Sequence, residues 1–267
     1  MPPPRCTPRL LVTGGIGNLG GHVLSRLRGR DVVIRALSRR PQLTVPAVEH
    51  VVADLTRRGT LDSALADVDV IVHCASAKKG DLEAARNLLD AASRLPHAPH
   101  FLLISIVGAA DVRFGYFQAK LDVEAAVESS GLPWTIQRST QFFDFILDGT
   151  QRLSRMPVIP VPKQFRCQPI DVREVADKLV ELTLGEPRGR APDIGGPERT
   201  TWAAMVRDYV GMTGRRRSVL EVPMPGMRSV RAGALLVGPD AEPDGPYGQT
   251  TWRAFLQARL HGEAVRR

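Results

Sequence analysis

The sequence contains few cysteines and few aromatic residues, and it has no long apolar run. Three of the 267 residues are cysteines and 5% are aromatic. Cys6, Cys74 and Cys167 are odd in number and share no metal-ligand spacing, which excludes a disulfide framework and favours a reducing, cytoplasmic setting. No apolar run approaches the roughly 20 residues that a membrane span needs. Residues 1–8 lack the apolar core of a signal peptide, so we expect no contact with a membrane.

The balance of charge is basic. The formal net charge is +8 at pH 7, and most of the basic residues are arginines. Such a charge favours an acidic partner, either nucleic acid or the phosphates of a cofactor or substrate. The tight cluster Arg215–Arg217 has no interleaved aromatic residues, which proteins that bind single strands use for stacking. We therefore expect arginines spread over solvated faces and no nucleic-acid partner.

The most informative stretch is residues 10–21, where a short apolar run breaks into glycines and a helical pattern follows. This order predicts a strand, a tight turn and a helix. The glycines suit the turn itself, a close approach of backbone N–H groups to a phosphate, and close packing of helix on strand. The N-terminus of the helix suits a pyrophosphate, so we predict a dinucleotide site rather than a purely structural turn. The predicted cofactor-binding residues here are Gly14, Gly17, Asn18, Leu19 and Gly20.

Strands and helices alternate through the first half of the chain. Strands are predicted over 31–37, 48–52, 68–74, 101–106 and 131–138, and helices over 61–66, 81–95 and 115–129. This alternation requires right-handed crossovers and predicts an α/β fold with a Rossmann-type, doubly wound parallel sheet. We expect an NAD(P)-binding domain over residues 1–198, including part of the substrate crevice at about 139–170. A small C-terminal subdomain over 199–267 is expected on the substrate side.

The end of the second predicted strand indicates which dinucleotide binds. An acidic residue there would bind the ribose 2′-hydroxyl and repel a 2′-phosphate, but the sequence has Arg39 and Arg40. NADP(H) is therefore favoured over NAD(H), the alternative being two surface arginines in a turn. After the third strand, Asp54 with Leu55 suits a hydrogen bond from the adenine amino group, or Asp54 simply caps the next helix.

The fourth predicted strand ends in small residues. Ala75 and Ser76 leave room for a cofactor ribose at this edge of the sheet. His73, just before them, has no second metal donor at a useful spacing, so we predict a packed histidine rather than a ligand.

A candidate catalytic pair opens the helix predicted over 115–129. Tyr116 and Lys120 are four residues apart and therefore lie on one helical face. A neighbouring ammonium favours the phenolate form of tyrosine, which suits proton transfer, and the same lysine can hold ribose hydroxyls. Such a pair also occurs by chance on surfaces, but after a nucleotide-binding fold it predicts catalysis.

The sixth predicted strand leads into a candidate substrate wall. Gln141, Phe142 and Phe143 follow that strand, and strand ends of this kind line the crevice of a doubly wound sheet. Buried helix packing is the alternative for the phenylalanines. Residues 156–162 are predicted to form an apolar loop stiffened by prolines, and residues 169–184 a helix. A short strand is expected near 192–194, with helices over 200–212 and 251–260.

Several motifs occur together along the chain. They are Thr13-Gly14-x-x-Gly17-x-x-Gly20, Asp54-Leu55, His73-Cys74-Ala75-Ser76, Lys120…Glu124…Ser130-Gly131-Leu132-Pro133-Trp134-Thr135-Ile136-x-Arg138, residues 169–177 and residues 193–197. Over about residues 9–200 the chain resembles the atypical short-chain dehydrogenases of the NmrA-like branch. The resemblance implies an NAD(P)-binding Rossmann domain with a variable C-terminal substrate part. It also implies a serine that polarises the substrate carbonyl, for which Ser105 is the candidate, although it lies slightly early in the chain.

The leading hypothesis is an NADPH-dependent oxidoreductase that transfers hydride to a ketone, quinone or enone of an apolar small molecule. In this hypothesis Tyr116 donates the proton and Ser105 orients the substrate oxygen. Lys120 lowers the pKa of Tyr116 and holds the cofactor ribose. The resemblance leaves two alternatives: a non-catalytic regulator that senses NADP(H), and a nucleotide-sugar epimerase or dehydratase. We expect no metal, and a monomer or homodimer.

Overall fold

The computed structural model describes residues 7–39, 45–76, 80–238 and 247–264. The chain forms two compact units. The first consists of Met1–Ser105, Gly115–Gln137 and Ala176–Ala191, and the second of Ile106–Phe114, Arg138–Val175 and Pro192–Arg267. Residues 199–267 therefore share their unit with two earlier segments of the chain.

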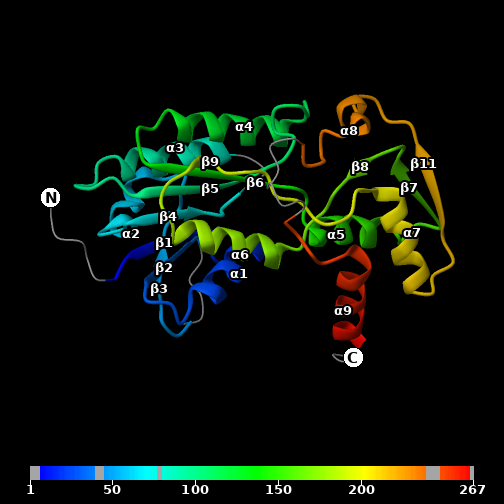
Figure 1. Ribbon diagram of the computed structural model, residues 1–267, viewed down its shortest axis with the longest axis horizontal. Helices are drawn as coiled ribbons and strands as arrows, with labels where there is room; N and C mark the ends of the chain where they lie inside the picture. The colour runs from blue at the N-terminus through cyan, green and yellow to red at the C-terminus, as the bar shows by residue number, and fades with distance from the viewer. Residues whose placement is uncertain (1–6, 40–44, 77–79, 239–246, 265–267) are drawn as a thin grey trace. The chain divides into compact units, whose positions relative to one another are not determined.

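The first unit is built on a seven-stranded sheet within the described residues, with the order β3-β2-β1-β4-β5-β6-β9 (Figure 1). The pairs β1–β2, β2–β3, β1–β4, β4–β5 and β6–β9 are parallel. The strand order reverses between β1 and β4, where doubly wound sheets place ligands at the carboxyl ends of the strands. The strands are β1 (Arg9–Thr13), β2 (Val33–Ser38), β3 (Val48–Val52), β4 (Val70–His73), β5 (His100–Ile106), β6 (Trp134–Ser139) and β9 (Gly189–Arg190).

Helices cover both faces of this sheet. Figure 1 shows α3 and α4 on one face and α1 and α6 on the other. Buried apolar residues from α3, α4 and the strands form a continuous core on the first of these faces, which confirms the predicted doubly wound α/β class. The helices are α1 (Asn18–Leu27), η1 (Arg58–Thr60), α2 (Asp62–Leu65), α3 (Asp81–Ala92), α4 (Gly115–Glu128) and α6 (Val172–Thr183).

The second unit contains two small sheets and four helices within the described residues. Strand β7 pairs in parallel with β11, and β8 pairs antiparallel with β10. An aromatic core that includes Phe143, Trp252 and Phe255 joins α5 to α9. The elements are α5 (Phe143–Leu153), β7 (Val158–Pro162), β8 (Arg166–Cys167), β10 (Thr200–Thr201), α7 (Trp202–Met212), β11 (Ser218–Val222), α8 (Arg228–Ala232) and α9 (Trp252–Ala264).

The loop predicted over 156–162 is wrong, because this segment contains strand β7. Ile159 and Val161 point into the core, and β7 is paired along its length with β11, far away in the sequence. Prolines that argued for a loop are tolerated in such a strand, because its sheet has only two members and leaves one edge unpaired. The short strand expected near 192–194 is not present there: Ile194 forms only an isolated bridge with Ser139, and β9 lies earlier, at Gly189–Arg190.

Among the described residues, no helix combines the length and apolar character that crossing a bilayer requires.

Candidate functional site

The turn between β1 and α1 has the geometry that its glycines predict. Gly14 has a φ of +69°, and a Cβ there would lie 2.8 Å from the backbone of Ala75. A Cβ on Gly20 would collide with the carbonyl oxygen of Gly14, so α1 packs this closely only with glycine. Gly17 is exposed, and its N–H donates to the carbonyl oxygen of Gly14 at 2.8 Å. The turn is a backbone-lined cradle that side chains would fill, and it fits a dinucleotide pyrophosphate.

The first turn of α1 begins with two exposed residues, Gly17 and Asn18. Gly17 is the N-cap residue, and within the described residues no side chain caps this helix and no acidic residue stands in its first turn. Asn18 is exposed, whereas the side chain of Leu19 is buried, so Leu19 can offer a ligand only its backbone. Free N–H groups at the positive end of a helix dipole suit a phosphate.

At the predicted adenosine end, Asp54 makes local hydrogen bonds. Its Oδ1 atom accepts from the backbone N–H of Thr56 at 3.0 Å and from the Thr56 hydroxyl at 2.8 Å. These two bonds, aided by the charges of Arg57 and Arg39, hold the pKa of the Asp54 carboxyl below its usual value. Both bonds lie within the turn before η1 and neither reaches the helix itself, so capping by Asp54 and adenine recognition both stay predictions.

The remaining predicted residues of this end differ in exposure. Arg39 directly follows β2 and is exposed, while Arg40 lies outside the described residues. The side chain of Leu55 belongs to the core, and its carbonyl oxygen accepts a bond of 3.0 Å from the Asn87 side chain. Arg39 is therefore available to a 2′-phosphate, and Leu55 acts as a packing residue.

The carboxyl end of β4 lies beside the glycine turn. His73 is buried, and its Nδ1 atom lies 2.8 Å from the hydroxyl of Thr13 at the end of β1. Burial lowers the pKa of His73 to about 4, so the imidazole is neutral at pH 7. The backbone N–H of Ala75 donates to the same Thr13 hydroxyl at 3.3 Å. In the part of the chain that the structure describes, no group of three or more His, Cys, Asp or Glu side chains is placed to hold a metal ion.

The predicted catalytic pair lies at this edge of the sheet, together with two further polar residues. Lys120 is buried in α4, and its Nζ atom lies 5.9 Å from the ring centroid of Tyr116, which is half exposed. The Lys120 ammonium also pairs with Asp81 Oδ2 at 3.2 Å, and the Ser76 hydroxyl donates to that oxygen at 2.9 Å. Residues from β4's end, α3 and α4 thus form one cluster, which we call the Lys120 cluster: Ser76, Asp81, Tyr116 and Lys120.

Asp81 was missed by sequence reasoning. An acidic residue at the first position of a helix ordinarily serves the helix dipole, and nothing in the local sequence distinguishes this one. The signal that could have found it is Lys120, because a lysine on the inner face of a neighbouring helix needs a counter-ion.

Ser105 lies near the end of β5 and is buried. Its hydroxyl has no hydrogen-bond partner among the residues that the structure describes. Buried hydroxyls are usually paired, so this one is free to bond a ligand oxygen or a water molecule. Its place in a catalytic triad with Tyr116 and Lys120 stays a prediction.

The predicted substrate wall in the second unit is only partly suited to that role. Phe143 is buried, with its ring centroid 5.6 Å from that of Trp252 and 5.1 Å from that of Phe255. The packing alternative therefore holds for Phe143, whose side chain has no surface left for a substrate. Phe142 is half-buried, and the Gln141 amide is buried with no partner among the described residues. For Gln141 and Phe142 a substrate contact stays a prediction.

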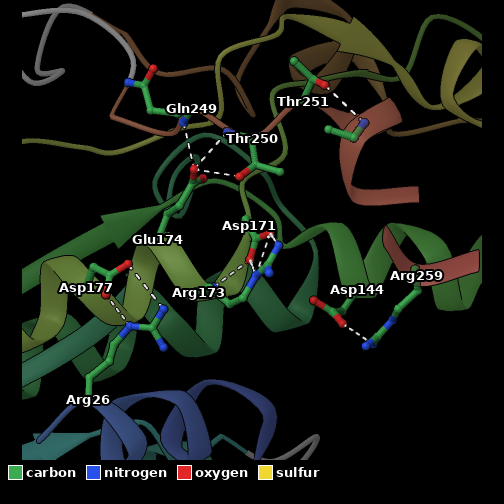
Figure 2. Close-up of polar contacts among 11 residues, drawn as sticks. Arg26, Asp144, Asp171, Arg173, Glu174, Asp177, Gln249, Thr250, Thr251 and Arg259 are labelled. Atoms are coloured by element: carbon green, nitrogen blue, oxygen red, sulfur yellow. Dashed lines mark hydrogen bonds and ion pairs between the residues drawn. The ribbon is translucent and has the colours of Figure 1, made fainter. Parts of the chain in front are cut away.

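The acidic residues at the start of α6 have structural roles (Figure 2). Asp171 accepts a bond of 2.8 Å from the backbone N–H of Arg173, and its buried carboxylate forms an ion pair with the guanidinium of the same arginine. Glu174 Oε1 accepts three bonds of 2.9 Å from the backbone N–H groups of Gln249 and Thr250 and from the Thr250 hydroxyl. This part of the motif over residues 169–177 therefore organises the chain before α9 and needs no chemical role.

Comparison with known proteins gives both family and fold matches. The sequence model of a family described as NAD(P)H-binding matches residues 14–184. A chloroplastic divinyl chlorophyllide a 8-vinyl-reductase from Cucumis sativus is 26% identical over 225 residues, which cover 70% of this chain and 52% of that protein. The chain thus spans about half the length of this relative. A (4-alkanoyl-5-oxo-2,5-dihydrofuran-3-yl)methyl phosphate reductase from Streptomyces griseus is 30% identical over 201 residues, covering 72% of this chain and 69% of the relative.

A solved structure shows the same fold. The NADPH-dependent quinone oxidoreductase of Escherichia coli, crystallised with NADPH, superposes with a TM-score of 0.80 over 94% of this chain and 99% of that one. The two sequences are 16% identical, so the similarity concerns the fold and leaves the substrate open.

Proposed function

Because the chain belongs to the NAD(P)H-binding family, we propose that it is an NADPH-dependent oxidoreductase of the atypical short-chain dehydrogenase type. In this proposal its substrate is a ketone, quinone or enone of a small apolar molecule. The named reductases among its relatives support the reaction class, and the chemistry must come from the site itself.

The observation that carries the proposal is the placement of Tyr116 and Lys120. A buried ammonium beside a half-exposed phenol is unusual for a surface pair, because lysines are almost never fully buried unless they are paired, as Lys120 is with Asp81. The pair adjoins the end of β4, whose next residues meet the glycine turn. Tyr116 keeps enough exposure to meet a substrate oxygen.

Each residue then has a defined task. The glycine turn and the first turn of α1 would hold the pyrophosphate, and Lys120 would hold the ribose next to the nicotinamide. NADPH, when bound, supplies the hydride. The Tyr116 hydroxyl gives its proton to the substrate oxygen, and the Lys120 ammonium stabilises the phenolate that remains. The free hydroxyl of Ser105 would donate a hydrogen bond to the same oxygen.

The preference for NADPH rests on Arg39. It follows β2 directly, is exposed, and has no acidic residue at the end of the strand to compete with a 2′-phosphate. We therefore expect NADPH to bind more tightly than NADH.

The test is to titrate the purified chain with NADPH and with NADH, following cofactor fluorescence, and then to follow NADPH oxidation with menadione and a panel of ketones and enones. Tight NADPH binding with substrate-dependent oxidation supports the proposal. Tight binding without oxidation of NADPH by any member of the panel would support the regulatory alternative. Interconversion of UDP-sugars without net loss of the cofactor would support the epimerase alternative.

A further inference from the structure

Asp81 and Lys120 form a buried ion pair that joins two helices. Asp81 opens α3 and Lys120 lies in α4, and the Nζ–Oδ2 distance is 3.2 Å. The side chains are 9% and 6% exposed, respectively. Removing two charges from water is costly, and a pair at this depth persists only where geometry and further hydrogen bonds compensate.

The carboxylate is held from a second side. The hydroxyl of Ser76, which follows the end of β4, donates to Asp81 Oδ2 at 2.9 Å, and this is the oxygen that Lys120 contacts. Asp81 therefore links the end of β4 to the lysine on α4. From there the Lys120 ammonium reaches the ring of Tyr116.

The same two charges act on the pKa of the neighbouring His73. Burial is the main cause of the lowered pKa of His73, the Lys120 charge lowers it further and the Asp81 charge raises it. Both charged groups therefore act at the carboxyl end of β4, which is the edge where a doubly wound sheet receives its cofactor.

We propose that Asp81 is a positioning residue that fixes the Lys120 ammonium at the carboxyl end of β4. Held there, Lys120 can reach the ribose hydroxyls of the nicotinamide nucleotide and stabilise the charge that develops on Tyr116. The positioning itself is a property of the chain, while its benefit to the cofactor rests on the proposed function.

A double-mutant cycle tests the proposal. The proteins are the wild type, Asp81→Asn, Lys120→Met and the double variant, and the first readout is the dissociation constant of NADPH from equilibrium fluorescence titration. Asp81→Asn should weaken NADPH binding about tenfold in the wild-type background and less than about twofold in the Lys120→Met background, because Asp81 acts through Lys120. Equal effects in both backgrounds, or unchanged or tighter binding by Asp81→Asn alone, would contradict the proposal.

Glu181→Gln provides a control at a second buried lysine. Lys178 is also buried and has a carboxylate at 3.2 Å, that of the half-exposed Glu181, and both residues lie on α6. This variant should leave the dissociation constant of NADPH unchanged within about twofold. A loss equal to that of Asp81→Asn would show that removing any such pair disturbs binding, and would overturn a specific role for Asp81.

Thermal unfolding of the four proteins without cofactor is the second readout. Lys120→Met should lower the melting temperature most, because it removes the ammonium that lies 3.2 Å from the buried Asp81 carboxylate, and the double variant should recover part of the loss. Additive effects would contradict the pairing. Quinone reduction is measured separately, so an enzyme that binds NADPH but reduces nothing would refute the proposed function while the cycle still decides the role of Asp81.

Discussion

At the residue scale, two neighbouring glycines of α1 differ in whether the structure has room for a Cβ atom. Gly20 and Gly21 are neighbours in α1, yet a Cβ would collide with the Gly14 carbonyl at the first and make only an ordinary contact of 3.7 Å at the second. The difference arises because only one face of the helix meets the turn. Helical periodicity therefore separates a glycine required by packing from one that is not.

This pair gives a prediction with an internal control. Gly20→Ala should lower the free energy of unfolding by more than about 1 kcal/mol and weaken NADPH binding at least about tenfold, because the turn must open to admit the methyl group. Gly21→Ala should leave binding unchanged and stabilise α1 by up to about 1 kcal/mol, since alanine favours helix. Chemical denaturation and NADPH titration of both variants measure this. Similar behaviour of the two variants would refute the assignment of Gly20 to close packing.

His73 gives a second prediction at the residue scale, concerning pH. Its pKa is about 4 in the folded chain against 6.5 as the ordinary value, so between these values the unfolded chain binds a proton that the folded chain does not. The free energy of unfolding should therefore fall as the pH falls from about 6.5 to 4, by roughly 3 kcal/mol in total from this residue. At pH 8 both states are neutral at this position and the contribution is constant.

The measurement is denaturant unfolding of the wild type and of His73→Asn between pH 4 and 8. The variant keeps a hydrogen-bonding group for Thr13 but cannot titrate, so the difference in unfolding free energy between the two proteins should change across this window and level off above pH 7. A constant difference from pH 4 to 8 would show that His73 is protonated as readily in the folded chain as in the unfolded one.

At the scale of whole elements, two phenylalanines of helix α5 lie in different environments, one buried and one exposed. Phe143 and Phe145 lie two residues apart, which puts them on different faces of the helix. Phe143 packs with Trp252 and Phe255, whereas Phe145 is 70% exposed. Phe142, Phe143 and Phe145 therefore cannot together form one wall of a substrate site.

The two residues provide a matched pair for measuring stability. Phe143→Ala should lower the free energy of unfolding by about 3–5 kcal/mol, because it leaves a cavity between α5 and α9. Phe145→Ala should change it by less than about 0.5 kcal/mol, as for other exposed positions. Urea denaturation of both variants supplies the numbers. A small effect of Phe143→Ala would mean that the aromatic cluster is not a core of the second unit.

At the scale of the whole molecule, the sequence predicted the sheet of the first unit well. Its strands are buried apolar runs separated by amphipathic helices, and these local patterns determine both the elements and their alternation. The second unit was predicted less well. Strand β7 contains two prolines and gains its identity only from pairing with β11, about 60 residues further along the chain. Contacts of this range leave no local periodicity.

In the candidate site, too, residues that are close in the sequence could be predicted and contacts between distant segments could not. Gly14, Gly17 and Gly20 could be recognised because the turn is local, and Tyr116 with Lys120 because they share one helix. Asp81 could not be recognised, because its partner lies on another helix and the ion pair exists only in the folded chain. Arg40 lies outside the described residues, so its predicted contact with a 2′-phosphate stays a prediction, as do those of the other cofactor residues and the substrate contacts of Gln141 and Phe142.

The central claim is that this chain uses the hydride of NADPH with Tyr116 as the proton donor. The most direct measurement compares the wild type with Tyr116→Phe for NADPH dissociation constant and for the rate of NADPH oxidation with a ketone or quinone that the wild type reduces. Tyr209→Phe, which removes a phenol from the core of the second unit, serves as the control. Tyr116→Phe should bind NADPH within about twofold of the wild type and oxidise it about 10²–10⁴-fold more slowly, while Tyr209→Phe should retain the wild-type rate. Tyr116→Phe turning over at the wild-type rate would contradict the central claim.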